Sequence, residues 1–418
     1  MKKSKLILSI ITLVCLALGF LFGFLLPEFT EKIAFFGDWY VKTLKVIIGP
    51  IIFVSIFLTV LNREKKKSLI ILKTVGLFVA MFLVTFLITS SIIAITQPGK
   101  GFIIDNASNT DSNADFGVGS ILLNLLPKDL ESLFYGGSIF FIIIVAFIIS
   151  LIISFTPIRK KTAEIFEIGK KYLGYVLQVV LFLTPLAVIS LVSSAVVKYG
   201  AMMVNAGLKY ILFAWGCSII ALILVMVLPV WIIGKINPFT YIRKVSKVWL
   251  VSLSSCSSVA TLPHTIKCCN EEFGISEKIT DVVVPLGCTI HMCGGAVSFA
   301  LLGLFVSQMS GVPLTFGTFM LMILSATLIN MAAPGIPGGG KEIGISYLSI
   351  LGLPIEGFYG FYAGIYSFLD MAYTTLNVTG DISANIIIDH FENKKEIASS
   401  NEEVVVDYTP NEKGKWRD

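Results

Sequence analysis

Charged residues are scarce in this chain of 418 residues. Asp, Glu, Lys and Arg make up 14% of the sequence, whereas a soluble domain carries about 25%. The seven cysteines show no paired spacing, so a disulfide framework is not expected, and together with the three histidines they match no zinc pattern. Hydrophobic residues make up 55% of the whole sequence, and the mean hydropathy is +0.86. The composition therefore predicts a polytopic membrane protein rather than a soluble one.

Six apolar segments in the first part of the chain fit ordinary membrane spans. Short basic clusters occur at the N-terminus and after the second, fourth and sixth segments, while the loops between them are acidic or neutral. Positive charge gathers in cytoplasmic loops, so this alternation predicts a cytoplasmic N-terminus. The net charge of +5 then reports orientation in a membrane and not nucleic-acid binding. The segments are 6–26, 43–61, 70–96, 137–156, 174–197 and 208–234.

After residue 250 the apolar segments become shorter and contain Gly, Pro and small polar residues. Backbone of this kind is tolerated at membrane depth only where protein or a cavity surrounds it. We therefore expect a re-entrant hairpin over 245–272, a broken span over 278–307, a second hairpin over 315–350 and a last span over 355–386. Interrupted segments in corresponding positions of two halves point to inverted repeats. The expected fold is an all-α polytopic membrane protein with eight transmembrane helices and two re-entrant hairpins.

The last span carries polar residues along one helical face. Asp370, Tyr373, Thr374, Asn377 and Asp381 share the spacing of a single face, and we call them the polar stripe. Carboxylates on a membrane helix are costly unless they face a cavity, a partner or an ion. A water-facing amphipathic helix is the alternative, but the flanking chain is too apolar for it. An intramembrane hydrolase is disfavoured because the two carboxylates lie about 16 Å apart along the helix.

Four motifs in this order resemble the dicarboxylate/amino acid:cation symporter family, which has the glutamate-transporter fold. They are the Ser-rich hairpin that ends Ala260-Thr-Leu-Pro263, the stretch Pro285-Leu-Gly-Cys-Thr-Ile290, the tip Pro334-Gly-Ile-Pro-Gly-Gly-Gly340 and the polar stripe. The resemblance implies a secondary active symporter that couples sodium, or alternatively protons, to uptake of an amino acid or small carboxylate. A substrate-gated channel is the competing class, although paired hairpins favour alternating access.

The resemblance also implies roles for single residues. Asp370 would hold a substrate ammonium group, and the tips of the hairpins would hold its carboxylate. Asp381, with carbonyls of Gly287, His291 and Asn377, would bind a coupling cation. A second cation site would use Thr289 with the backbone of Asn330, Met331 and Ala333. The substrate set is Ser257, Ser258, Gly335, Pro337, Gly338, Asp370, Tyr373, Thr374 and Asn377.

Two departures from the family pattern bear on substrate and ion. Tyr373 stands where acidic-substrate members have an Arg, and Cys256 stands where some members have another. A second substrate carboxylate would then be buried unpaired, so a neutral amino acid is expected in place of glutamate or aspartate. A dicarboxylate or acidic amino acid:proton symporter is the alternative.

The second departure lies in the family's Asn-Met-Asp-Gly-Thr, which reads His291-Met-Cys293-Gly-Gly295 here. The partners of its Asp in the third span become Phe78, Met81 and Phe82, so a further sodium site looks lost. His291 is then either a proton carrier or a neutral, hydrogen-bonded core residue.

The resemblance also predicts how the chain is divided and where it resides. Residues 1–244 form mainly a scaffold, with the third and sixth spans associating with a transport domain over 245–386. Residues 387–418 form a disordered cytoplasmic tail. We expect a homotrimer in the plasma membrane with both termini cytoplasmic. The expected partners are a small-molecule substrate and the lipid bilayer, with sodium or protons as coupling ion, no organic cofactor and no nucleic acid.

Overall fold

The computed structural model describes residues 2–61, 68–102, 139–332, 339–353 and 358–402, and every regular element in these ranges is helical. Three of the described helical stretches are long and apolar enough to cross a membrane: Ile70–Thr96, Met202–Ile232 and Glu277–Ser310. Large apolar side chains such as Phe155, Leu212 and Phe316 lie on the surface. An all-helical chain with such a surface agrees with the predicted membrane protein.

The first group of helices follows the predicted spans with two corrections. The second helix begins at Pro27, well before the expected 43. The segment expected over 174–197 is two helices that meet at Leu183, because Pro185 has no N–H to continue the preceding helix. The elements are α1 (Lys2–Leu25), α2 (Pro27–Leu61), α3 (Ser68–Thr96), α6 (Ile139–Ser154), α7 (Arg159–Phe182), α8 (Thr184–Tyr199) and α9 (Ala201–Ala221), which continues through a π-helical turn (Leu222–Val227) into α10 (Leu228–Ile232).

The second group contains the interrupted elements. The expected break in 278–307 falls at His291 and Met292, where the backbone is extended between two helices. The last helix continues to Glu402, so the disordered tail expected from residue 387 is wrong for 387–402. The elements are α11 (Pro238–Ser255), α12 (Ser258–Lys267), a π-helical turn (Cys268–Glu272), α13 (Glu277–Ile290), α14 (Cys293–Met309), α15 (Phe316–Ala332), α16 (Gly339–Ile350) and α17 (Phe358–Glu402).

Helices α11 and α12 form a helical hairpin where the sequence predicts the first one. Its turn is Cys256, which adopts a left-handed conformation with φ of 47°, followed by Ser257, whose side chain accepts a hydrogen bond from the backbone of Ala260 at 3.2 Å. At the open end, Lys247 forms an ion pair of 2.5 Å with Glu272. The ion pair thus connects the two arms away from the turn.

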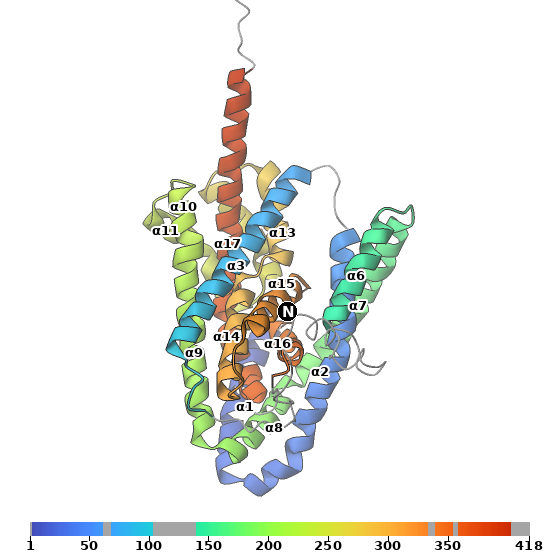
Figure 1. Cartoon of the computed structure of the whole chain (residues 1–418), viewed down its shortest axis with the longest axis vertical. Helices are drawn as coiled ribbons and strands as arrows, with labels where there is room; N and C mark the ends of the chain where they lie inside the picture. Colours follow the sequence, from blue (N-terminus) through green and yellow to red (C-terminus); the bar gives the residue numbers. More distant parts are fainter. Residues whose placement is uncertain (1, 62–67, 103–138, 333–338, 354–357, 403–418) are drawn as a thin grey trace, which may run out of the picture.

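The helices pack in two groups around α17. Helices α2, α6 and α7 stand together on one side in Figure 1, and α8 packs against α1 and α2. On the other side α14 packs along α3, and both α14 and α17 contact α9. The centre of α17 is buried on all sides from Leu369 to Ile388, apart from the partly exposed Met371. The polar stripe therefore lies in the interior of the protein.

Candidate functional site

The polar stripe of α17 divides between two buried environments. Asp370, Tyr373, Thr374 and Asn377 line a cavity, whereas Asp381 lies outside the lining and contacts His291. All of them are buried, with Asp370 8% exposed and Asp381 2%. The other residues that line the cavity come from α11 to α16 and are Cys256, Ser258, Met292, Gly295, Ser298, Phe299, Asn330, Gly340 and, on α17, Tyr366.

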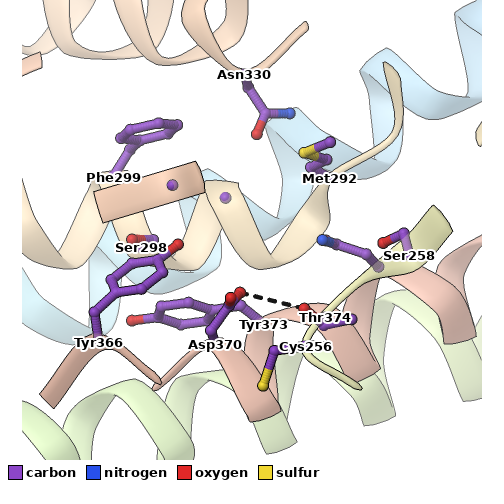
Figure 2. Close-up of a pocket in the computed structure, with 13 residues that line it drawn as sticks. Cys256, Ser258, Met292, Ser298, Phe299, Asn330, Tyr366, Asp370, Tyr373 and Thr374 are labelled. Carbon is purple, nitrogen blue, oxygen red and sulfur yellow. Dashed lines mark hydrogen bonds between the residues drawn. The ribbon is translucent and has the colours of Figure 1, made fainter. Parts of the chain in front are cut away.

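Asp370 is the charged residue among those that line the cavity. Its carboxylate accepts a hydrogen bond of 3.2 Å from the Thr374 hydroxyl, one helical turn away (Figure 2). Ser258 is the first residue of α12, so the unpaired N–H groups of that helix start beside the same cavity. A carboxylate and a helix N-terminus facing one space suit a ligand with one positive and one negative end.

Asn377 connects the cavity to the broken helix. Its side-chain oxygen accepts a hydrogen bond of 2.7 Å from the backbone N–H of Gly294, in the first turn of α14. With the oxygen engaged, the amide nitrogen of Asn377 is the group that can donate to a ligand. Gly294 permits this approach because a Cβ there would overlap the backbone of Tyr373. The break in the helix thus brings α14 against the stripe.

Aromatic hydroxyls form the wall of the cavity around the position of Tyr373. Its ring lies 6.3 Å from that of Tyr366, and its hydroxyl faces Tyr210 and Ser298. The Tyr366 hydroxyl packs against Gly340, where a Cβ would overlap it. None of the described side chains that line the cavity is Lys, Arg or His. The wall offers neutral hydrogen-bonding groups and no described cation.

Asn330 fills space left by the glycine at position 295. A Cβ on Gly295 would overlap the side-chain oxygen of Asn330, so the small residue lets the amide enter. Asn330 is 2% exposed, and its oxygen has no hydrogen-bond partner among the described residues. Figure 2 shows the side chain near Met292 at the edge of the cavity. The Asn330 oxygen is thus a buried acceptor without a described partner, on a residue that lines the cavity.

Asp381 pairs with His291 below the cavity. The Nδ1 of His291 lies 2.9 Å from the Asp381 carboxylate, and its Nε2 lies 3.0 Å from the thiol of Cys293. The ring of Phe78 stacks on the imidazole at 4.4 Å. Gly287 also touches Asp381, since a Cβ there would overlap the carboxylate. Two of the predicted neighbours of Asp381, Gly287 and His291, therefore lie against its carboxylate, and His291 does so through its imidazole.

The remaining predicted residues lie elsewhere or outside the described residues. Ser257 serves as the N-cap of α12 and does not line the cavity. Thr289 is exposed, with its hydroxyl donating to the carbonyl of Leu286 at 2.8 Å. Met331 lies in the last turn of α15. Ala333, Gly335, Pro337 and Gly338 fall outside the described residues, so their roles stay predictions.

Sequence reasoning missed several residues of the cavity wall. Ser298 and Phe299 lie on an apolar helix with no polar pattern, and Met292 sits in the break. Tyr366 offered a signal, because it lies one helical turn before Asp370 on the same face. The others enter the cavity only through contacts between distant segments.

Comparison with known proteins gives matches along most of the chain. A family model described as "Sodium:dicarboxylate symporter family" matches residues 8–391. The chain is 25% identical to the C4-dicarboxylate transport protein of Bordetella avium over 402 residues, which cover 92% of this chain and 89% of that protein. It is 22% identical to the proton/glutamate-aspartate symporter of Bacillus subtilis over 407 residues, which cover 93% and 96%. It is 34% identical to human excitatory amino acid transporter 2 over 160 residues, which cover 38% and 28%.

Proposed function

The chain belongs to the sodium:dicarboxylate symporter family of multi-pass membrane transporters, which are not enzymes, and on this premise we propose the ligand and the ion that it carries. It is a secondary active symporter that couples inward movement of a cation to uptake of an amino acid with an uncharged side chain. The single observation that carries this proposal is the cavity on α17, in which Asp370 is the charged residue of the described lining and none of the described lining residues is basic.

The charge of the cavity argues for a substrate with an ammonium group. A buried carboxylate is stabilised by a cationic partner, and hydrogen bonds to charged groups are stronger than neutral ones. The substrate carboxylate would lie at the N-terminus of α12 near Ser258, and the amide nitrogen of Asn377 would donate to it. Tyr366 and Tyr373 would then face the substrate side chain with neutral hydroxyls and ring surfaces.

A dicarboxylate or acidic amino acid is the second candidate. The names of the Bordetella and Bacillus relatives favour it. A second carboxylate in this cavity would meet Tyr366 and Tyr373 instead of an Arg fork, and an unpaired buried charge is costly. We therefore place the neutral amino acid first.

Other parts of the proposal follow the family. The coupling ion is sodium or a proton. Residues 1–244 would form mainly a scaffold, which the packing of α1 with α8 supports. The third and sixth spans would associate with the transport domain over 245–386, which the packing of α3 and α9 against α14 supports. The transport domain would move as an elevator against the scaffold, in a homotrimer of the plasma membrane with both termini cytoplasmic.

Uptake into proteoliposomes tests the proposal. Labelled alanine, serine, cystine, aspartate and succinate are supplied with an inward sodium gradient, and separately with an inward proton gradient and no sodium. We expect accumulation of a neutral amino acid against its gradient in one of the two conditions. Exclusive accumulation of aspartate or succinate would favour the second candidate. Equilibration without accumulation would indicate a channel.

A further inference from the structure

We infer that the imidazole of His291 takes the place of the cation at Asp381, so that this carboxylate does not bind sodium. One consequence of this inference rests on the proposed function: any sodium dependence of uptake would arise elsewhere in the protein. Its grounds are the contacts of the two side chains, which compete directly with an ion for the same carboxylate.

Each hydrogen-bonding atom of the imidazole already has a partner. Nδ1 lies 2.9 Å from the Asp381 carboxylate, and Nε2 lies 3.0 Å from the Cys293 thiol. The side chains of His291 and Asp381 are almost fully buried, with 0% and 2% exposure. The hydrogen bond from His291 offsets part of the free-energy cost of burying the Asp381 carboxylate, so no ion is needed for that purpose.

The side chains around the pair are unsuited to sodium. Hard cations take oxygen ligands, whereas thiols and imidazoles suit softer metals. The described side chains nearest to the pair include the Cys288 and Cys293 thiols, the thioether of Met226 and the ring of Phe78.

The backbone is packed against both members of the pair. A Cβ on Gly287 would overlap the Asp381 carboxylate, and one on Gly380 would overlap the edge of the His291 ring. The ring is also covered by Phe78, whose plane is inclined by 16° to the imidazole. The imidazole is therefore held from several sides, and an entering sodium ion would have to displace it.

The same donor set does not form a site for a softer metal. No group of three or more His, Cys, Asp or Glu residues that could hold a metal ion is found in the part of the chain that the structure describes. The pair therefore acts as a built-in substitute for an ion and not as a different metal centre.

Thermal unfolding of the purified full chain tests the inference without transport. Melting temperatures are compared in sodium chloride and in choline chloride at equal ionic strength, for the wild type and for Asp381→Asn. We expect no difference between the two proteins in how sodium shifts the melting temperature. A sodium-specific rise in the wild type that disappears in Asp381→Asn would overturn the inference, because ligand binding to the native state raises stability.

A second variant tests the role of the imidazole directly. His291→Asn removes the ring and leaves an amide, so we expect a sodium-specific rise in melting temperature of a few degrees to appear. His264→Asn, at an exposed histidine of α12, is the matched control and should show no such rise. A sodium rise shared equally by the wild type and His291→Asn would contradict the inference.

Uptake separates this inference from the proposed function. If neither gradient drives accumulation of any tested substrate, the proposed function fails while the melting comparison still stands. If uptake depends on sodium and Asp381→Asn retains the sodium affinity of the wild type, the inference is supported. If Asp381→Asn lowers that sodium affinity tenfold or more, the inference is wrong although the chain is a symporter.

Discussion

Replacing Asp370 by Asn removes the charge of the cavity and keeps the shape of the side chain. The carboxylate is 8% exposed, and the Thr374 hydroxyl donates to it at 3.2 Å, an arrangement that an amide oxygen can keep. The substitution removes the interaction between the carboxylate and a substrate ammonium group. Stability should therefore change little, whereas substrate affinity should fall.

The size of the effect follows from the strength of such contacts. A hydrogen bond to a charged group contributes about 1.5–3 kcal/mol. Because 1.4 kcal/mol corresponds to a factor of ten, the affinity should fall about 10- to 150-fold. Burial of the carboxylate places the expected value toward the upper part of that range, since solvent screens the contact only weakly.

The assay compares an amino acid with its 2-hydroxy analogue. The amino acid is the one that the uptake panel identifies, and inhibition constants for both compounds are measured against its labelled form. The wild type should prefer the amino acid, and Asp370→Asn should lose most of that preference while binding the hydroxy analogue nearly as before. Asp281→Asn, at an exposed carboxylate of α13, is the matched control. An unchanged preference in Asp370→Asn would refute the assignment of this carboxylate.

Three further substitutions probe the walls of the cavity. Tyr373→Arg should raise the affinity for aspartate, relative to that for a neutral amino acid, at least about tenfold, measured as inhibition constants. Tyr373→Phe, the control, should leave this ratio of affinities unchanged. An unchanged ratio in Tyr373→Arg would count against the neutral substrate. Gly294→Ala should lower the melting temperature, because its Cβ would overlap the backbone of Tyr373, and overpacking costs about 1–3 kcal/mol. Asn330→Leu should leave the melting temperature nearly unchanged, since no described residue bonds the Asn330 oxygen, but should weaken substrate binding several-fold, by about 0.5–1.5 kcal/mol. A loss of stability without a loss of affinity in Asn330→Leu would assign that side chain to packing.

Much of the fold was readable because the relevant signals are local. The polar stripe predicted a helix that faces the interior, and α17 is buried along that face. The run of small and polar residues before Pro263 predicted a helical hairpin, and α11 and α12 form one. The break in the seventh span falls at His291, inside the stretch that the sequence marks as interrupted. Each of these features depends on residues close together in the chain.

The errors concern boundaries that composition does not fix. A run of apolar residues continues across Pro185, so the sequence predicts one span where the proline separates α7 from α8. The extension of α17 to Glu402 was missed because its last turns are polar and lack apolar periodicity. Part of that extension is attached to α3 through an ion pair between Lys73 and Glu392, a contact between residues far apart in sequence.

Part of the site could be predicted because the spacing of the polar stripe is a local signal in the sequence. The stripe residues were named from spacing, but their two environments were not, because the stripe alone does not say which neighbours arrive from α11, α14 and α15. The side-chain contact of His291 with Asp381 illustrates this limit. The resemblance suggested a backbone carbonyl at position 291, whereas the structure brings the ring itself to the carboxylate.

The length of α17 allows this helix to transmit a movement at the binding cavity to a distant part of the protein. Its 45 residues extend about 68 Å, roughly twice the thickness of the hydrocarbon core of a bilayer. Glu392 lies about 33 Å from Asp370 along the same rod and is held to Lys73 by a contact of 2.6 Å. Any tilt or translation of the helix at Asp370, which lines the cavity, is therefore carried to the far end of α17. A spectroscopic label near that end would follow the movements of the binding cavity from a distance, without altering a single residue inside it.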